Sequence, residues 1–240
     1  MPPLSLLHTS DLHNYIDLQM AGMLRHLRIE HGALLLDSGD AIWAGNVFVK
    51  LGPEPAIRRM NEAGYAAMAL GNREYFFRAC GLLMKTVEAR FPVLSANLIA
   101  CSGDLGHVRR WTILQAPGGA RVGLFGLTPL MIPPGSWAEV FSNMRFLAHE
   151  AATAAAVAAL RDECDYLVCL SHAGFARDCE LAEAFGQLDV ILGGHSHQEL
   201  AELVSINGVS ISHVGAYGRR VGLLRSRPGG GFDRELLQPN

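Results

Sequence analysis

Five short apolar segments of this chain each end in a cluster of polar residues, and this repeated arrangement constrains the fold more than any other feature. The segments are 4–7, 33–36, 65–70, 166–170 and 189–192. Continuous apolar runs of this length are typical of strands that are buried on both faces. Helical patterns separate most of the segments, so the sequence predicts βαβ units and a mainly parallel sheet.

The remaining elements indicate a second sheet in the same domain. A turn at 116–119 separates predicted strands at 108–114 and 121–127, which favours a hairpin. Further strands are predicted at 93–96, at 232–237 and within 202–227 around a turn at Asn207 and Gly208. Helices are predicted at 18–29, 54–63, 75–90, 146–163 and 177–185. We therefore expect residues 1–240 to form one α/β domain, with two mixed sheets face to face and helices outside.

Composition and charge argue against several classes of protein. Apolar residues make up 50% of the chain and charged residues 18%, which excludes a disordered protein. The formal net charge of −3 argues against nucleic acid as a partner. The most apolar long stretch, 151–160, has ten uncharged residues, too few for the roughly 20 of a membrane helix, and the first residues lack the basic start of a signal peptide. A cytoplasmic protein with no membrane partner is the expectation, and five cysteines without CxxC spacing suit reducing conditions.

The polar clusters that follow the five segments contain side chains that bind metals. The candidates are Asp11, His13, Asp40, Asn72, His172, His195 and His197. They are expected to meet, because the carboxyl ends of strands in open α/β sheets form the edge where ligands bind. Imidazole together with carboxylate suits first-row transition metals better than Ca²⁺. If 11–13 and 195–197 are extended, both side chains of each pair point the same way and can hold one ion.

The order of these clusters resembles the calcineurin-like metallophosphoesterase family. The series is Asp-x-His, Gly-Asp, Gly-Asn, His and Gly-His-x-His, and the segments 8–13, 95–98 and 215–222 are similar to the 5′-nucleotidase branch. The resemblance extends over about residues 4–227. It implies a four-layer αββα sandwich and two divalent transition metal ions (Mn, Fe, Zn or Co). One ion would be held by Asp11, His13 and His197, the other by Asn72, His172 and His195, with Asp40 bridging.

The resemblance also implies an activity. A small phosphorylated substrate would be hydrolysed by a hydroxide that the two metal ions share and that attacks phosphorus in line. Asp40, Asn72 and Arg73 are the expected catalytic residues. The same ligand set serves a nucleotidase-like monoesterase, a phosphodiesterase or a phosphoanhydride hydrolase, so these alternatives remain open.

Arg73 stands where the family usually has the histidine of Gly-Asn-His-Glu or Gly-Asn-His-Asp. Arginine is no general acid near neutral pH, because its pKa is above about 12. It can donate two hydrogen bonds to phosphate oxygens, so Arg73 is expected to bind substrate without protonating the leaving group. The substitution also allows an alternative, a binding or scaffold protein with weakened turnover.

Other positions carry weaker expectations. Asn14 is expected either to bind substrate or to cap the helix that follows it, and Glu74 to hold its loop. His8 and His213 are expected to orient metal ligands. Arg219 and Arg220 are expected to be a solvated pair, with contact to an anionic substrate as the alternative. The 5′-nucleotidase branch carries a C-terminal domain that stacks the nucleobase, and this sequence is expected to lack that nucleotide-specificity domain. Aromatic residues that could line a pocket instead are Tyr15, Trp43, Phe76, Phe77, Trp137 and Tyr217.

Overall fold

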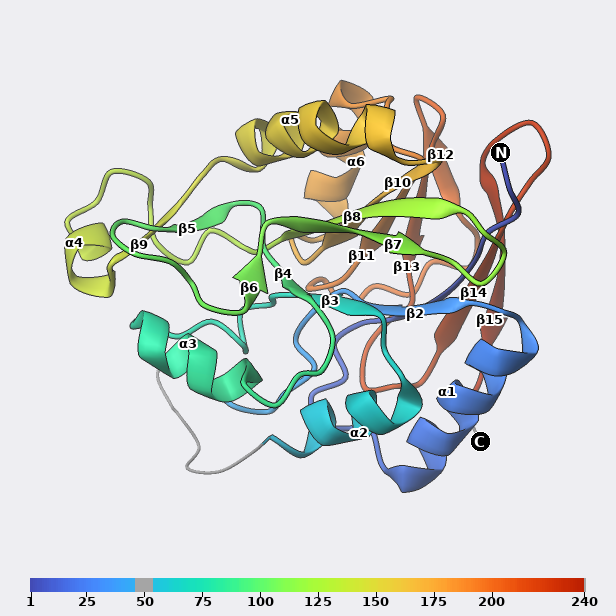
Figure 1. Cartoon of the computed structure of the whole chain (residues 1–240), viewed down its shortest axis with the longest axis horizontal. Coiled ribbons are helices and arrows are strands. Elements are labelled where there is room, and N and C mark those ends of the chain that lie inside the picture. Colours follow the sequence, from blue (N-terminus) through green and yellow to red (C-terminus); the bar gives the residue numbers. More distant parts are fainter. Residues whose placement is uncertain (46–53, 240) are drawn as a thin grey trace.

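Two β-sheets lie face to face between two groups of helices (Figure 1). The computed structural model describes residues 1–45 and 54–239. In spatial order, the seven-stranded sheet contains β15 (Phe232–Leu237), β14 (Val221–Ser226), β1 (Ser5–Thr9), β2 (Leu34–Asp37), β3 (Ala67–Ala69), β4 (Val93–Leu94) and β6 (Val108–Arg109). The six-stranded sheet contains β12 (Val204–Ile206), β13 (Val209–His213), β11 (Val190–Gly193), β10 (Tyr166–Ser171), β8 (Arg121–Leu127) and β7 (Trp111–Gln115). A separate pair consists of β5 (Leu98–Ala100) and β9 (Met144–Phe146).

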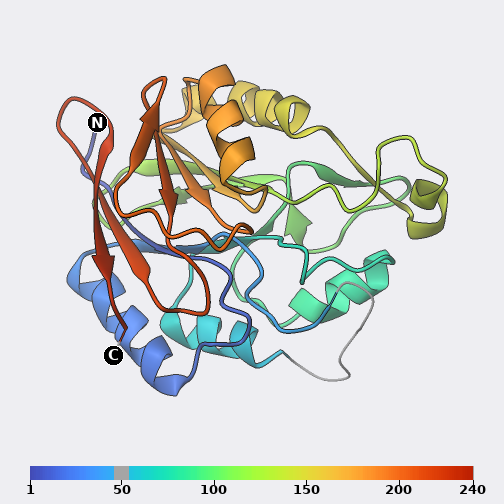
Figure 2. The same cartoon turned by 180° about the vertical axis from the view of Figure 1, so that it is seen from behind.

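The helices form the two outer layers, as Figures 1 and 2 show from opposite sides. The seven-stranded sheet is covered by α1 (Leu18–Glu30), α2 (Pro55–Ala63) and α3 (Ala79–Thr86). The six-stranded sheet is covered by α5 (His149–Leu160), a 3-10 turn (Arg161–Glu163) and α6 (Phe175–Ala184). A short helix, α4 (Ala138–Ser142), lies at one end of the molecule beside β9. No helix within the described residues has the length and apolar character needed to cross a membrane.

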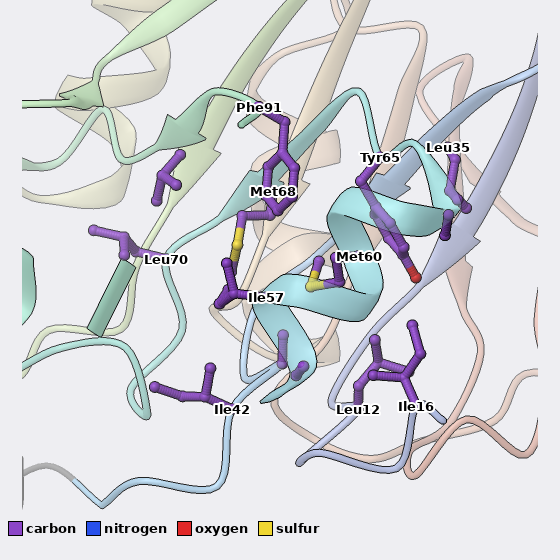
Figure 3. Close-up of a cluster of buried hydrophobic side chains, with 14 of the residues drawn as sticks. Leu12, Ile16, Leu35, Ile42, Ile57, Met60, Tyr65, Met68, Leu70 and Phe91 are labelled. Carbon is purple, nitrogen blue, oxygen red and sulfur yellow. The ribbon is translucent and has the colours of Figure 1, made fainter. Parts of the chain in front are cut away.

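Three buried apolar clusters separate the layers. Leu6 and Leu36 of the first sheet pack with Leu124 and Val168 of the second. A second cluster lies between the first sheet and its helices, with Met60 of α2 at its centre (Figure 3), and a third lies under α5 and α6. Each of β1, β2, β10 and β11 therefore buries both faces, which explains their continuous apolar sequences. The expected α/β fold with a four-layer αββα sandwich is confirmed.

Local signals set the ends of the first helices. Asp17 is the N-cap of α1, because its side chain accepts a hydrogen bond of 2.8 Å from the backbone N–H of Met20. The expectation that Asn14 caps this helix is wrong. The Asn14 side-chain oxygen instead accepts a hydrogen bond of 3.2 Å from the N–H of Ala56, so it caps α2, which also begins with Pro55.

Two predicted elements differ from the structure because tertiary contacts recruit their backbone. The predicted strand 108–114 divides at Arg110, since β6 pairs with β4 in one sheet while β7 pairs with β8 in the other. The predicted helix 75–90 is shorter, and α3 begins at Ala79. The carbonyl of Tyr75 accepts a hydrogen bond of 2.8 Å from the Lys85 ammonium, so it does not enter a helical ladder.

The two sheets approach closely at Gly126 of β8, which makes this residue a sensitive test of the sandwich. A Cβ atom at Gly126 would lie 2.2 Å from the backbone oxygen of Leu94 in β4. Gly126→Ala is therefore expected to cost about 2–3 kcal/mol of unfolding free energy, because neither backbone can move freely. Gly22→Ala in α1 is the control: a Cβ atom added there would have no neighbouring atom within 4 Å, so alanine should stabilise the helix by about 0.5–1 kcal/mol. Urea denaturation of both variants measures the difference, and equal stabilities would contradict the close approach.

Candidate metal centre

The candidate ligands lie at the carboxyl ends of neighbouring strands. Asp11, Asp40 and Asn72 follow β1, β2 and β3, which are adjacent and parallel in the seven-stranded sheet. His172 follows β10, and the loop with His195 and His197 follows β11, its parallel neighbour in the other sheet. The two sheets therefore contribute to one edge of the sandwich, as expected for ligand sites in α/β proteins.

Asp11, His13 and His197 form one compact group. The Nε2 atom of His197 lies 3.3 Å from Asp11 Oδ1, and the Nε2 atom of His13 lies 3.9 Å from the same oxygen. The two imidazole Nε2 atoms are 3.1 Å apart. Three donor atoms thus converge within the space that a single ion would fill.

Asp11, Asp40 and His172 form a second group, and all three are buried. His172 Nε2 lies 3.4 Å from Asp40 Oδ1 and 3.7 Å from Asp11 Oδ1. The other ring nitrogen, Nδ1, donates a hydrogen bond of 2.7 Å to the carbonyl of Ser38. That bond fixes the imidazole with Nε2 toward the carboxylates.

Asn72 and His195 adjoin these groups. The Asn72 side-chain oxygen lies 3.0 Å from His195 Nδ1, and the His195 ring centroid is 5.1 Å from that of His172. All seven candidates are therefore linked by direct contacts. Asp11 belongs to both compact groups of acidic and histidine side chains and Asp40 to one of them, and the bridging role that the resemblance implies for Asp40 stays a prediction.

The donor set fits divalent metal ions. Among the described residues, the buried nitrogens His13 Nδ1 and His172 Nε2 have no hydrogen-bond partner. Burial disfavours a charged imidazole, yet the carboxylates of Asp40 and Asp11 raise the pKa of His172 to about 10. The site therefore favours positive charge at its centre, and a cation would satisfy the carboxylates and imidazoles together.

The backbone at the site is unusual. The φ angles of five candidate ligands lie in the left-handed region: Asp11 (50°), His13 (45°), Asp40 (55°), His195 (71°) and His197 (53°). The expected extended conformation of 11–13 and 195–197 is therefore wrong, and tight turns bring these side chains together instead. Such conformations cost of order 1–3 kcal/mol each and cluster at functional sites. They persist here because backbone bonds tie the loops together, for example from the N–H of His13 to the carbonyl of Asp40 at 2.9 Å.

Glu74 holds the loop, as expected. Its buried carboxylate accepts hydrogen bonds from four backbone N–H groups, those of Gly71 (2.9 Å), Asp40 (3.0 Å), Ala41 (2.9 Å) and Ile42 (3.3 Å). Burial and the negative charge of Asp40 raise the pKa of Glu74 to about 7. Glu74 therefore joins the segments that carry Asp40 and Asn72, and it belongs to neither compact ligand group.

Arg73 lies at the mouth of the centre. Its backbone N–H donates a hydrogen bond of 2.7 Å to Asp40 Oδ1, and its Nε lies 3.9 Å from Asp40 Oδ2. The guanidinium donates to the carbonyl of Trp43 at 3.1 Å and lies over the Trp43 ring. The side chain is 35% exposed, so part of it is available to a ligand.

Buried hydrogen bonds support the ligand loops from behind. His213 Nε2 lies 2.7 Å from Asp178 Oδ2, and its Nδ1 lies 3.5 Å from Oγ of Ser196, between His195 and His197. His8 is connected to the centre through Ser38. Its Nε2 lies 2.9 Å from Ser38 Oγ, and the Ser38 carbonyl accepts a hydrogen bond from His172 Nδ1. Asp178 was not predicted from the sequence, because nothing in the helical pattern of 177–185 distinguishes a buried aspartate from a solvated one.

Comparisons with known proteins give a family match. Residues 4–199 match the profile of the calcineurin-like phosphoesterase family. The 5′-nucleotidase of Homo sapiens is 31% identical over 81% of this chain and 38% of its own length, and a probable 5′-nucleotidase of Treponema pallidum is 28% identical over 91% and 40%. The chain thus spans about two fifths of the length of these relatives. The structure of a 5′-nucleotidase precursor from Thermus thermophilus superposes with a TM-score of 0.79 at 26% identity, covering 99% of this chain and 54% of that one.

Proposed function

This chain belongs to the calcineurin-like phosphoesterase family, and we propose that it hydrolyses small phosphate esters at a centre of two divalent metal ions. The proposed ligands are Asp11, His13, Asp40, Asn72, His172, His195 and His197. The observation that carries the proposal is the convergence of two buried aspartates with histidine side chains, among them the buried His172 Nε2, which has no hydrogen-bond partner among the described residues. Bound cations supply Lewis acidity and positive charge for a phosphoryl group and its attacking water.

The residues of the chain have distinct tasks in this proposal. His172 is held by the Ser38 carbonyl and keeps its second nitrogen directed at Asp40 and Asp11. Glu74 fixes the loops that carry Asp40 and Asn72. Arg73 donates hydrogen bonds to phosphate oxygens from the mouth of the site, where its guanidinium is partly exposed. The side-chain oxygen of Asn14 accepts a hydrogen bond from α2, so a contact of Asn14 with substrate would come from its amide nitrogen.

Phosphate monoesters are the proposed substrates, since the relatives that the chain matches are named 5′-nucleotidases. The test is to strip purified protein with a chelator, reload it with Mn²⁺, Zn²⁺ or Co²⁺, and measure hydrolysis of p-nitrophenyl phosphate. Elemental analysis counts the bound ions. We expect two ions and metal-dependent turnover. Preferential hydrolysis of the corresponding bis ester would indicate a diesterase, and preferential hydrolysis of a pyrophosphate would indicate an anhydride hydrolase. No turnover with any metal would favour a binding or scaffold protein.

Arg73→His tests how this chain departs from its family. Histidine can protonate a leaving group near neutral pH and arginine cannot, and such assistance is worth about 10²–10⁴ in rate. Turnover of an alkyl phosphate, whose leaving group needs a proton, is therefore expected to rise at least about tenfold relative to p-nitrophenyl phosphate. Arg58→His is the control, because Arg58 is exposed and pairs with Glu88. An equal change on alkyl and aryl substrates would contradict the proposed role.

A further inference from the structure

An aromatic corner formed by Tyr15 and Tyr217 lies directly beside the candidate metal ligands. The two rings meet edge to face, with centroids 5.2 Å apart and planes at 73°. The Tyr217 ring is 5.3 Å from the His13 ring and 5.4 Å from the His197 ring. The corner is therefore in contact with the first group of candidate metal ligands, which contains His13 and His197.

Two cavities open against this corner. One, of about 490 Å³, is lined by Tyr15, Tyr217 and Arg219. The other, of about 410 Å³, lies between Tyr15, Met20, Tyr217 and Pro239. Both volumes fall in the range of small-molecule sites, about 300–1,000 Å³. Tyr15 is 58% exposed, so an aromatic ring of the protein faces this space without cover.

The backbone that carries Tyr217 is held in place by tertiary contacts. Tyr217 has a φ of 62°, which is rare for a bulky residue, and its N–H donates a hydrogen bond of 2.8 Å to the carbonyl of Asp11. Gly218 packs so closely that a Cβ there would lie 2.9 Å from the Tyr15 carbonyl and 2.9 Å from the end of Met20. Backbone that is fixed in advance lowers the entropic cost of binding a ligand, and strained backbone clusters at functional positions.

The side chain of Arg219 lies beside the two tyrosine rings. The guanidinium carbon of Arg219 lies 5.6 Å from the centroid of the Tyr217 ring. Arg219 makes no ion pair within residues 1–45 and 54–239, whereas Arg220 pairs with Glu199 at 3.2 Å. The two arginines are therefore not equivalent solvated residues. A planar guanidinium without a carboxylate partner can stack on a flat ring or donate to its substituents.

Two exposed tryptophans, Trp43 and Trp137, differ from this corner. Trp43 has the guanidinium of Arg73 over its ring at 5.8 Å, and its carbonyl accepts a hydrogen bond from the same group. Trp43 is 57% exposed, but the guanidinium over its ring is also held by Asp40 and the Trp43 carbonyl, whereas Arg219 over Tyr217 makes no ion pair within the described residues. Trp137 is 75% exposed and directly precedes α4, which lies at one end of the molecule (Figure 1).

We propose that Tyr15, Tyr217 and Arg219 form a subsite for a planar aromatic ring in the alcohol part of the phosphate ester. A flat ring that stacks on one tyrosine presents its edge to the other, which is the favoured geometry for aromatic groups. The subsite rests on the proposed function, since it binds the part of the substrate that leaves. It assigns a substrate class: phosphate esters whose alcohol carries an aromatic ring.

The test compares 3-phenylpropyl phosphate with 3-cyclohexylpropyl phosphate on metal-loaded enzyme. The scissile bonds and leaving alcohols are alike, and the substrates differ in the flatness of the ring. Stacking on an aromatic side chain is worth about 1–3 kcal/mol, so kcat/KM should favour the phenyl ester about tenfold. Tyr15→Ala and Arg219→Ala should each move the ratio toward one, and Tyr15→Phe should keep it. Trp137→Ala is the matched control and should leave the ratio unchanged.

Binding of the non-hydrolysable 3-phenylpropyl and 3-cyclohexylpropyl phosphonates, measured by calorimetry, separates the two proposals. Preference for the phenyl phosphonate that Tyr15→Ala removes would support the subsite even in a protein that hydrolyses neither ester, and the proposed hydrolysis would then be wrong. Hydrolysis of both esters at equal kcat/KM, with equal binding of both phosphonates, would overturn the subsite and leave the hydrolase intact.

Discussion

Asp11→Asn is expected to lower kcat/KM for p-nitrophenyl phosphate at least about a thousandfold, which corresponds to about 4 kcal/mol of transition-state stabilisation. Asp11 belongs to both compact ligand groups, so its loss affects both ions. Asparagine keeps the shape of the side chain and an oxygen for the backbone N–H of His195, which lies 3.0 Å from the Asp11 carboxylate. The missing negative charge is therefore the main change. Elemental analysis of the reloaded variant should find fewer than two ions per chain.

Asp37→Asn is the matched control for this loss. Asp37 is also a buried aspartate of the same sheet, three positions before Asp40, but it belongs to neither ligand group. Its carboxylate accepts hydrogen bonds from Thr9 Oγ1 at 2.6 Å and from the N–H of Gly39 at 2.8 Å, and asparagine keeps the shape of the side chain and an oxygen for the Gly39 N–H. We expect this variant to keep two ions and its activity. An Asp11→Asn enzyme with full metal content and turnover would refute the proposed centre.

Asp40→Asn, measured in parallel, identifies the carboxylate that the two ions share. Family resemblance assigns that role to Asp40, while the compact groups in the structure share Asp11. Loss of the shared carboxylate removes both ions, and loss of the other removes one. The metal content of the two variants therefore decides between the two arrangements.

Glu74→Ala is expected to cost about 3–5 kcal/mol of unfolding free energy. The substitution leaves four backbone N–H groups, those of Gly71, Asp40, Ala41 and Ile42, without their acceptor. A buried donor without a partner costs about 1–3 kcal/mol, and water entering the space recovers part of the sum. Urea denaturation with a constant m-value provides the measurement.

Two further variants interpret this result. Glu74→Gln keeps one acceptor oxygen, and should lose about half as much stability as Glu74→Ala. Glu62→Ala removes an exposed glutamate that pairs with Arg59, and should cost less than about 1 kcal/mol. A Glu74→Ala protein as stable as Glu62→Ala would contradict the role of Glu74 in joining the two ligand loops.

The core strands were predictable because buried strands are recognisable from local sequence. The apolar segments at 4–7, 33–36 and 166–170 became β1, β2 and β10 within two residues of the predicted ends. Elements near the surface were harder to predict. The strands β5 and β9 and the helix α4 were missed, because they are short and the pairing of β5 with β9 has no local signal.

The sequence by itself determined which chemical groups follow each strand, because the end of a strand and the metal-binding residues after it can both be recognised from short local patterns. Only the tertiary structure decided how those groups meet. The left-handed turns at Asp11 and Asp40, the four N–H groups on Glu74 and the corner of Tyr15 and Tyr217 depend on contacts between residues far apart in the chain. Those contacts form only when the two sheets pack together, because strained turns are stable only where surrounding hydrogen bonds and packing offset their cost.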